Sequence, residues 1–196
     1  MSSAKPKIAL IIGSTRPTRF ADKPAQWMLK QAKARTDMDV ELVDLRDYDL
    51  PFFNEMASNL WMPSQDPNAV KWQQKLAEFD GFVFVVAEYN RSMTASLKNA
   101  MDQAYKEWVR KPMGAIAYGS VGGARALEHL RTVAVELQMV PVRNAVHIGG
   151  GDFFKTSPLG ANAAIEEIEA NLLPGATALL DDIVWWAKAT MAAKSA

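Results

Sequence analysis

The chain has 196 residues, no cysteine, two histidines and equal numbers of basic and acidic residues, so its formal net charge is zero. This balance argues against general affinity for nucleic acid and against electrostatic docking on a membrane. The lack of cysteine excludes disulfides, a thiolate nucleophile and cysteine-ligated metal or iron–sulfur centres. His129 and His147 lie far apart and show no metal-ligand spacing.

The length predicts one domain over 1–196, large enough to bury a full core. The N-terminal residues are few and polar, and the apolar run that follows, 8–12, is too short for a signal-peptide core or a membrane span. We therefore expect a cytoplasmic protein.

Strands and helices alternate along the chain. Apolar runs predict five strands, at 7–13, 40–45, 81–87, 113–118 and 140–148. Helical periodicity predicts helices ending near residue 35 and covering about 70–79, 94–109 and 123–138. The C-terminal part is predicted to be helical in two pieces, split near Pro174 and Gly175. Because the strands are continuous apolar runs separated by helices, we expect a parallel sheet covered on both faces, a three-layer αβα sandwich.

Two segments do not fit this alternation. Residues 46–68 contain three prolines and no clear period, which is typical of a cap or an interaction surface. Residues 149–154 are three glycines, an aspartate and two phenylalanines. This composition suggests a flexible lid or partner contact, and an ordinary surface loop is the alternative.

Polar or glycine-rich loops follow three of the predicted strands. The first, from Gly13 to Arg19, carries hydroxyls and two guanidinium groups and opens a helix, a setting that favours an anion such as phosphate. It matches neither a P-loop nor a Gly-x-Gly-x-x-Gly loop, so ATP hydrolysis and a Rossmann NAD site are not supported. A plain turn with solvated arginines is the alternative.

The other two loops suit a flat ligand. Glu88, Tyr89 and Asn90 offer an aromatic plane beside an amide, although Tyr89 packed on a neighbouring helix would be the plainer interpretation. Gly122 and Gly123 open the next helix and allow the backbone to approach a ligand closely, or simply form a tight turn. Since open α/β sheets bind ligands at the carboxyl ends of their strands, the three loops together predict one composite site.

These motifs resemble those of the NADPH-dependent FMN reductase family. Gly-Ser-Thr-Arg-Pro-x-Arg, Glu-Tyr-Asn-x-Ser followed by 97–102, and Tyr-Gly-Ser-x-Gly-Gly occur in the family's order over about 7–148. The resemblance implies a flavodoxin-like fold with a five-stranded parallel sheet in the order 2-1-3-4-5. It places Ser14, Arg16 and Arg19 at the FMN phosphate, the second loop at the isoalloxazine edge and the third on the pyrimidine side. The implied cofactor-binding residues are Gly13, Ser14, Arg16, Arg19, Phe20, Glu88, Tyr89, Asn90, Ser120, Val121, Gly122 and Gly123.

The same resemblance implies a ping-pong oxidoreductase. NADPH, or NADH in its place, would pass hydride to N5 of bound FMN, and a small acceptor would then take the electrons: a quinone, an azo compound, a metal oxyanion or free flavin. The N–H groups of Gly122 and Gly123 would stabilise negative charge on the reduced ring. No side chain is assigned as catalytic, and no metal is expected.

Two other functions stay open on the sequence. A non-enzymatic electron carrier of flavodoxin type would typically be acidic, which the balanced charge does not match. A structural member that has lost flavin is suggested only by Ala87, where the family usually has proline.

The resemblance also implies a homodimer or homotetramer. A stripe of Leu97, Met101, Tyr105 and Trp108 on the predicted helix 94–109 would form the interface, or would simply face the sheet.

Overall fold

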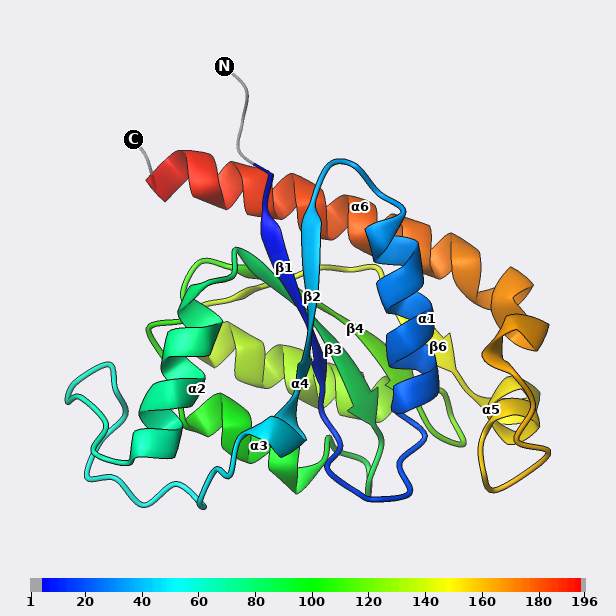
Figure 1. Ribbon diagram of the computed structural model, residues 1–196, viewed down its shortest axis with the longest axis horizontal. Coiled ribbons are helices and arrows are strands. Elements are labelled where there is room, and N and C mark those ends of the chain that lie inside the picture. The colour runs from blue at the N-terminus through cyan, green and yellow to red at the C-terminus, as the bar shows by residue number, and fades with distance from the viewer. Residues whose placement is uncertain (1–4, 195–196) are drawn as a thin grey trace.

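The structure is a computed structural model that describes residues 5–194 as three layers (Figure 1). Its strands are β1 (Lys7–Ile12), β2 (Asp39–Asp44), β3 (Gly81–Ala87), β4 (Pro112–Tyr118), β5 (Val140–Pro141) and β6 (Val146–Ile148). Its helices are α1 (Asp22–Lys33), α2 (Pro67–Ala77), α3 (Ala95–Asp102), α4 (Ala124–Glu136), α5 (Gly150–Thr156) and α6 (Glu169–Lys194). Two short 3₁₀ turns, η1 (Leu45–Asp47) and η2 (Ile165–Ile168), complete the set.

The sheet has the expected order. All strand pairs are parallel, the path is β2-β1-β3-β4-β5, and β6 also pairs with β4. Ile12 lies opposite Val85, and Tyr118 lies between Ala87 and Ile148. The carboxyl ends of β1, β3, β4 and β6 are therefore level, so the loops that follow them meet along one edge. The prediction of a flavodoxin-like sandwich is confirmed.

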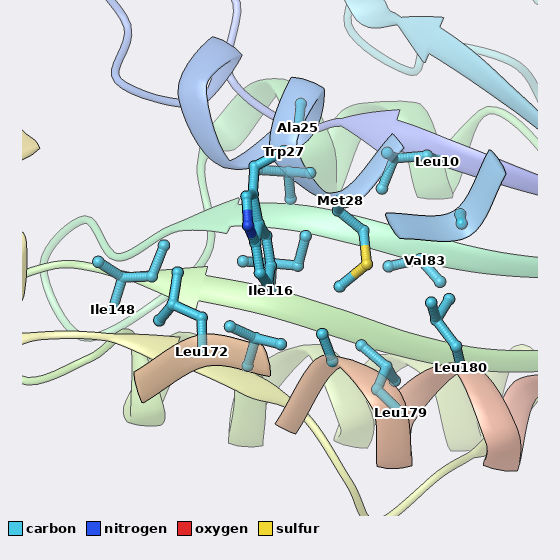
Figure 2. Close-up of a cluster of buried hydrophobic side chains, with 14 of the residues drawn as sticks. Leu10, Ala25, Trp27, Met28, Val83, Ile116, Ile148, Leu172, Leu179 and Leu180 are labelled. Atoms are coloured by element: carbon cyan, nitrogen blue, oxygen red, sulfur yellow. The ribbon is translucent and has the colours of Figure 1, made fainter. Parts of the chain in front are cut away.

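Side chains from both faces of the sheet fill two cores. In β3 the odd-numbered residues pack toward α1 and α6, whereas Phe82 and Phe84 pack toward α2, α3 and α4. Figure 2 shows the first core, to which Trp27 of α1, Ile116 of β4 and Leu179 of α6 contribute buried side chains. Burying each large apolar side chain contributes about 1.5–3 kcal/mol, which explains why β3 and β4 are buried along their whole length.

The predicted fifth strand, 140–148, is two short strands instead. Arg143 to Ala145 leave the ladder between β5 and β6, whereas Val142 N still donates to Met113 O at 2.9 Å. Arg131 of α4 donates to the carbonyl oxygens of Val142 and Arg143 at 3.0 and 2.6 Å. Both carbonyls therefore pair with α4, and Pro141 within the run lacks the N–H that a continuous strand would use.

The predicted helix 94–109 ends early. Helix α3 stops at Asp102, and turns follow. The indole N–H of Trp72 donates to Ala100 O at 2.7 Å, and that of Trp108 donates to Met101 O at 3.2 Å. Side chains thus occupy the carbonyls that a longer helix would have used.

The stripe predicted as an interface is mostly interior. Leu97, Met101 and Trp108 are at most 1% exposed, and the Trp108 ring lies edge-on to Phe82 with 4.7 Å between centroids. Tyr105 is half-buried, and its hydroxyl donates to Glu136 O at 3.0 Å. The argument for an interface from these residues is therefore wrong, because they serve the core of one chain.

Two C-terminal expectations also need correction. Helix α6 is not split at Pro174 and Gly175 but runs through both. A Cβ on Gly175 would lie 3.0 Å from Ala145 O, so this glycine allows close packing rather than ending the helix. The segment 149–154, expected to be flexible, begins α5, with Phe153 buried.

The long irregular segment is as predicted between Tyr48 and Asp66, although η1 precedes it and α2 begins already at Pro67. The Asp66 carboxylate caps α2 by accepting from the N–H groups of Asn68 and Ala69. None of the helices within 5–194 combines the length and apolar character needed to cross a membrane.

Candidate functional site

A cavity of about 390 Å³ lies at the edge of the sheet where the loops meet. Six of the predicted site residues line it, namely Arg16, Arg19, Phe20, Glu88, Tyr89 and Ser120. Gly13, Ser14, Asn90, Val121, Gly122 and Gly123 stand in the same loops but do not line it. The structure thus brings together side chains from all three loops.

Backbone and side-chain hydrogen bonds fix the start of the first loop at Gly13. Gly13 N donates to Val85 O at 3.0 Å, and its own oxygen accepts from the hydroxyls of Thr94 and Ser96. A Cβ at Gly13 would come within 2.9 Å of Val85 O. Within residues 5–194, the N–H groups of Ser14, Thr15 and Arg16 find no protein acceptor. Such a run of unpaired N–H groups before a helix is suited to bind an anion.

Arg16 links the first loop to the second. Its side chain is exposed, and its NH1 donates to the Tyr89 hydroxyl at 3.0 Å. The guanidinium carbon lies 5.8 Å from the centre of the Tyr89 ring. No carboxylate within the described part of the chain pairs with Arg16, so most of its N–H donors remain available to an anionic ligand.

Arg19 is placed differently from Arg16. Its side chain is 1% exposed and donates to Asp22, Asp44 and Ser14 O. Burial alone would lower the pKa of Arg19, but hydrogen bonds to Asp44 and Asp22 raise it above the ordinary value. These bonds use all five N–H donors of a guanidinium. Arg19 therefore forms part of the cavity wall without a spare donor.

Glu88 ties the second loop to the third. Its carboxylate is 5% exposed and pairs with Arg125, whose Nε lies 2.6 Å away and whose backbone N–H donates at 3.2 Å. Arg125 is a residue that the sequence interpretation missed. The signal for it was present, because a cation two residues after Gly123 falls in the first turn of a helix that starts beside the site.

The second loop is a tight hairpin. Tyr89 and Ser92 exchange backbone hydrogen bonds at 2.8 and 2.9 Å. Asn90 and Arg91 at its tip have φ angles of 49° and 69°, the left-handed region that asparagine tolerates well. Ser92 Oγ lies 2.6 Å from His129 Nδ1. The hairpin presents the Tyr89 ring to the cavity and directs Asn90 to the surface.

The third loop needs its glycines. Gly122 and Gly123 have φ angles of 72° and 65°, and a Cβ on Gly123 would lie 2.5 Å from Tyr118 N. Gly122 N already donates to Gly119 O at 3.0 Å. The sequence predicted that the N–H groups of Gly122 and Gly123 would face a ligand. The N–H group of Gly122 instead forms a hydrogen bond within the turn. Ser120 and Val121 are exposed at the tip.

An aromatic cluster forms the floor of the cavity. Phe20 contacts the rings of Tyr118 and Phe153 at centroid distances of 5.0 and 5.6 Å. Burial, reinforced by nearby Tyr89, raises the pKa of Tyr118 above its ordinary value, so its phenol stays neutral. The sequence interpretation did not assign Tyr118, although this residue begins the Tyr-Gly-Ser motif.

The remaining wall comes from α5 and the residues after it. Phe153, Phe154, Ser157 and Leu159 line the cavity. Ser157 Oγ is buried and has no hydrogen-bond partner in the structure. A buried hydroxyl left unpaired costs free energy of folding.

A second hollow of about 610 Å³ lies on the other side of the first loop. Thr15, Arg46 and Phe52 border it, but no residue of the second or third loop does. Of the ring-binding residues predicted from the sequence, none borders the second hollow, and Glu88, Tyr89 and Ser120 line the first cavity. Its size, its aromatic floor and the anion-binding loop beside it fit a planar ring that carries a phosphate.

Known proteins are similar to this chain in sequence. The family model for NADPH-dependent FMN reductase matches residues 6–152. An NAD(P)H-dependent FMN reductase of Schizosaccharomyces pombe is 38% identical over 137 residues, which cover 68% of each chain. A 2-hydroxy-1,4-benzoquinone reductase of a Burkholderia species is 34% identical over 143 residues, covering 68% of this chain and 73% of that protein.

The fold is also found in a solved structure. The flavoenzyme FerB of Paracoccus denitrificans, an NAD(P)H:acceptor oxidoreductase, superposes with a TM-score of 0.68 over 94% of this chain and 98% of its own, at 23% identity. Because the family model covers most of the chain and includes all three loops, the resemblance seen in the motifs is confirmed. The chain belongs to the NADPH-dependent FMN reductase family and is an oxidoreductase that uses FMN and NAD(P)H.

Proposed function

We propose that this enzyme carries electrons from NAD(P)H to a small organic acceptor in a ping-pong cycle, with FMN held in the cavity of about 390 Å³. The observation that carries the proposal is that one cavity collects side chains from all three loops. Bound FMN would supply the two-electron chemistry. With a quinone, NAD(P)H and one proton yield NAD(P)⁺ and the hydroquinone.

The residues of the chain would divide the work of binding. The unpaired N–H groups of the first loop and the guanidinium of Arg16 would hold the phosphate. Arg19, with every donor committed, would keep that loop in shape. The Glu88–Arg125 pair would fix the second loop against the third, and the neutral phenol of Tyr118 would donate a hydrogen bond.

A quinone is the acceptor we favour. Similar proteins are named for a benzoquinone substrate and for azo compounds, the latter in an FMN-dependent NADPH-azoreductase of Staphylococcus haemolyticus that is 27% identical over 151 residues. A simple electron carrier of flavodoxin type remains the second candidate, and the zero net charge argues against it because such carriers dock through acidic surfaces.

A fluorescence titration tests the site. FMN should bind one site per chain, and Arg16→Ala should weaken binding by about 10–150-fold, because a hydrogen bond to a charged group is worth about 1.5–3 kcal/mol. Arg143→Ala removes an exposed arginine that does not line the cavity and is the matched control. Equal affinity for the Arg16 variant and the control would contradict the phosphate assignment. FMN binding without NADPH oxidation in the presence of a quinone would favour the electron carrier.

We also propose a homodimer, with a homotetramer as the larger alternative. Phe52, Met56 and Trp61 of the long irregular segment are 81%, 88% and 78% exposed. The segment is nevertheless anchored, since the side-chain amides of Asn99 and Gln103 donate to Pro51 O at 2.8 and 2.6 Å. An ordered surface with large apolar side chains is typical of a protein interface, and a second copy of this chain is the partner we infer.

A further inference from the structure

The wall formed by residues 153–159 is the part of the cavity that the family model does not include. That model ends at Asp152, whereas the loops at 13–19, 88–92 and 119–123 all fall inside it. The shared loops would serve the shared cofactor. A wall that lies beyond the shared part is suited to distinguish this enzyme's acceptor from those of its relatives. We call residues 150–163 the α5 arm.

A lysine of α1 is a main anchor of the α5 arm, and Gly150 N and Asp152 add hydrogen bonds to Ser120 O and Asn171. Lys23 Nζ, in the first turn of α1, shares its three N–H donors among four oxygens, namely Thr156 O, Asn162 O and Ala163 O at 2.8, 2.9 and 2.9 Å and Asn162 Oδ1 at 2.7 Å. Inside the arm, Ala161 N donates to Phe154 O at 3.0 Å. The arm is therefore a defined surface anchored to the helix that follows the first loop.

The side chains that the arm offers are mainly apolar. Phe153 is packed into the aromatic floor, whereas Phe154 and Leu159 line the cavity and are also 50% and 77% exposed. Apolar side chains left open at a ligand cavity gain from covering a flat organic molecule, which removes their surface from water. A hydrated inorganic anion gains nothing from the same contact.

We propose that Phe154 and Leu159 contact the electron acceptor and give the enzyme its preference for flat, uncharged aromatic acceptors over inorganic oxyanions. This inference rests on the proposed function, since it needs FMN in the cavity. It assigns the α5 arm to the acceptor and leaves the cofactor to the three shared loops.

The test compares the FMN-loaded protein with its F154A/L159A variant. Both side chains are at least half exposed, so the fold should tolerate their removal. The ratio of kcat/KM for 1,4-naphthoquinone to kcat/KM for chromate should fall about five- to tenfold, mostly through KM. The dissociation constant of naphthoquinone for the oxidised protein, measured by calorimetry without NADPH, should rise by a similar factor. A variant with Val135→Ala and Trp185→Ala removes two exposed apolar side chains that do not line the cavity, and it should keep the original ratio.

Two results would overturn the inference. An unchanged ratio would show that the arm does not contact the acceptor. A clear rise in the dissociation constant of FMN, with an equal loss for both acceptors, would show that the arm holds the cofactor. The unsubstituted chain tests the proposed function separately. If it does not bind FMN, or does not oxidise NADPH in the presence of naphthoquinone, the proposed function itself is wrong.

Discussion

Replacing Arg19 by Met should lower the free energy of unfolding by about 2–4 kcal/mol at pH 7. Breaking one side of a buried ion pair costs about 3–5 kcal/mol. The cost is reduced here because Asp44 keeps Arg46, whose NH2 lies 2.8 Å away, and because Asp22 is half-exposed and can be hydrated. Arg46→Met is the matched control. It breaks a pair with the same Asp44 carboxylate, but its side chain is 42% exposed, so a loss of at most about 1 kcal/mol is expected.

The pH dependence provides a second check. Burial alone would raise the pKa of Asp44, but Arg19 and Arg46 lower it well below its ordinary value. A depressed carboxyl pKa gives stability that is present above the pKa of the unfolded chain and is lost as the pH falls through the folded pKa. The difference between the original chain and Arg19→Met should therefore shrink below about pH 4. Urea unfolding at pH 7 and pH 3 measures it. Equal losses for the two arginine variants, or a loss at pH 3 as large as at pH 7, would refute the reasoning.

Two further predictions concern the third loop and the assembly. Gly123→Ala should cost about 2–5 kcal/mol of unfolding free energy, because the new Cβ would sit 2.5 Å from Tyr118 N at a φ of 65°. Gly151→Ala, whose Cβ would meet no atom within 4 Å, should change it by less than about 0.5 kcal/mol, and similar urea midpoints for the two variants would contradict this. Light scattering should give a mass of at least about twice 21.6 kDa, which Phe52→Asp combined with Met56→Asp should reduce. An active original chain at 21.6 kDa would exclude the dimer.

Much of the fold follows from local sequence, and two of the exceptions have a similar cause. The run from Gly81 to Ala87 is apolar at six of its seven positions, so its assignment as a buried strand was secure. At the end of α3 and in the last predicted strand, side chains took up backbone carbonyls. The indoles of Trp72 and Trp108 donate to carbonyls at the end of α3, and Arg131 donates to the carbonyl that follows β5, where Pro141 was a local signal for a break in the strand. Contacts of this kind depend on the finished fold and cannot be found from periodicity.

The site shows the same division between local and long-range information. The position of the three loops followed from strand ends, which is a property of any parallel sheet. Identifying Asp44 as a partner of Arg19 requires the register between neighbouring strands. Asp44 lies opposite Ile12 in the pairing of β1 with β2, so the sheet order 2-1-3-4-5, once adopted, already places a carboxylate beside the first loop. The α5 arm had no such constraint, because its anchor, Lys23, is more than 130 residues away in the sequence.

The two arginines of the first loop show why residue type alone does not define a binding site. Both lie in the loop that the sequence resemblance assigns to the FMN phosphate, and both line the cavity. All five N–H donors of Arg19 form hydrogen bonds within the chain. Arg16 forms one short side-chain hydrogen bond, from its NH1 to the Tyr89 hydroxyl at 3.0 Å. A cation can hold a ligand phosphate only with donors that the fold has left unused. We therefore expect substitution of Arg16 to weaken FMN binding and substitution of Arg19 to lower the stability of the fold.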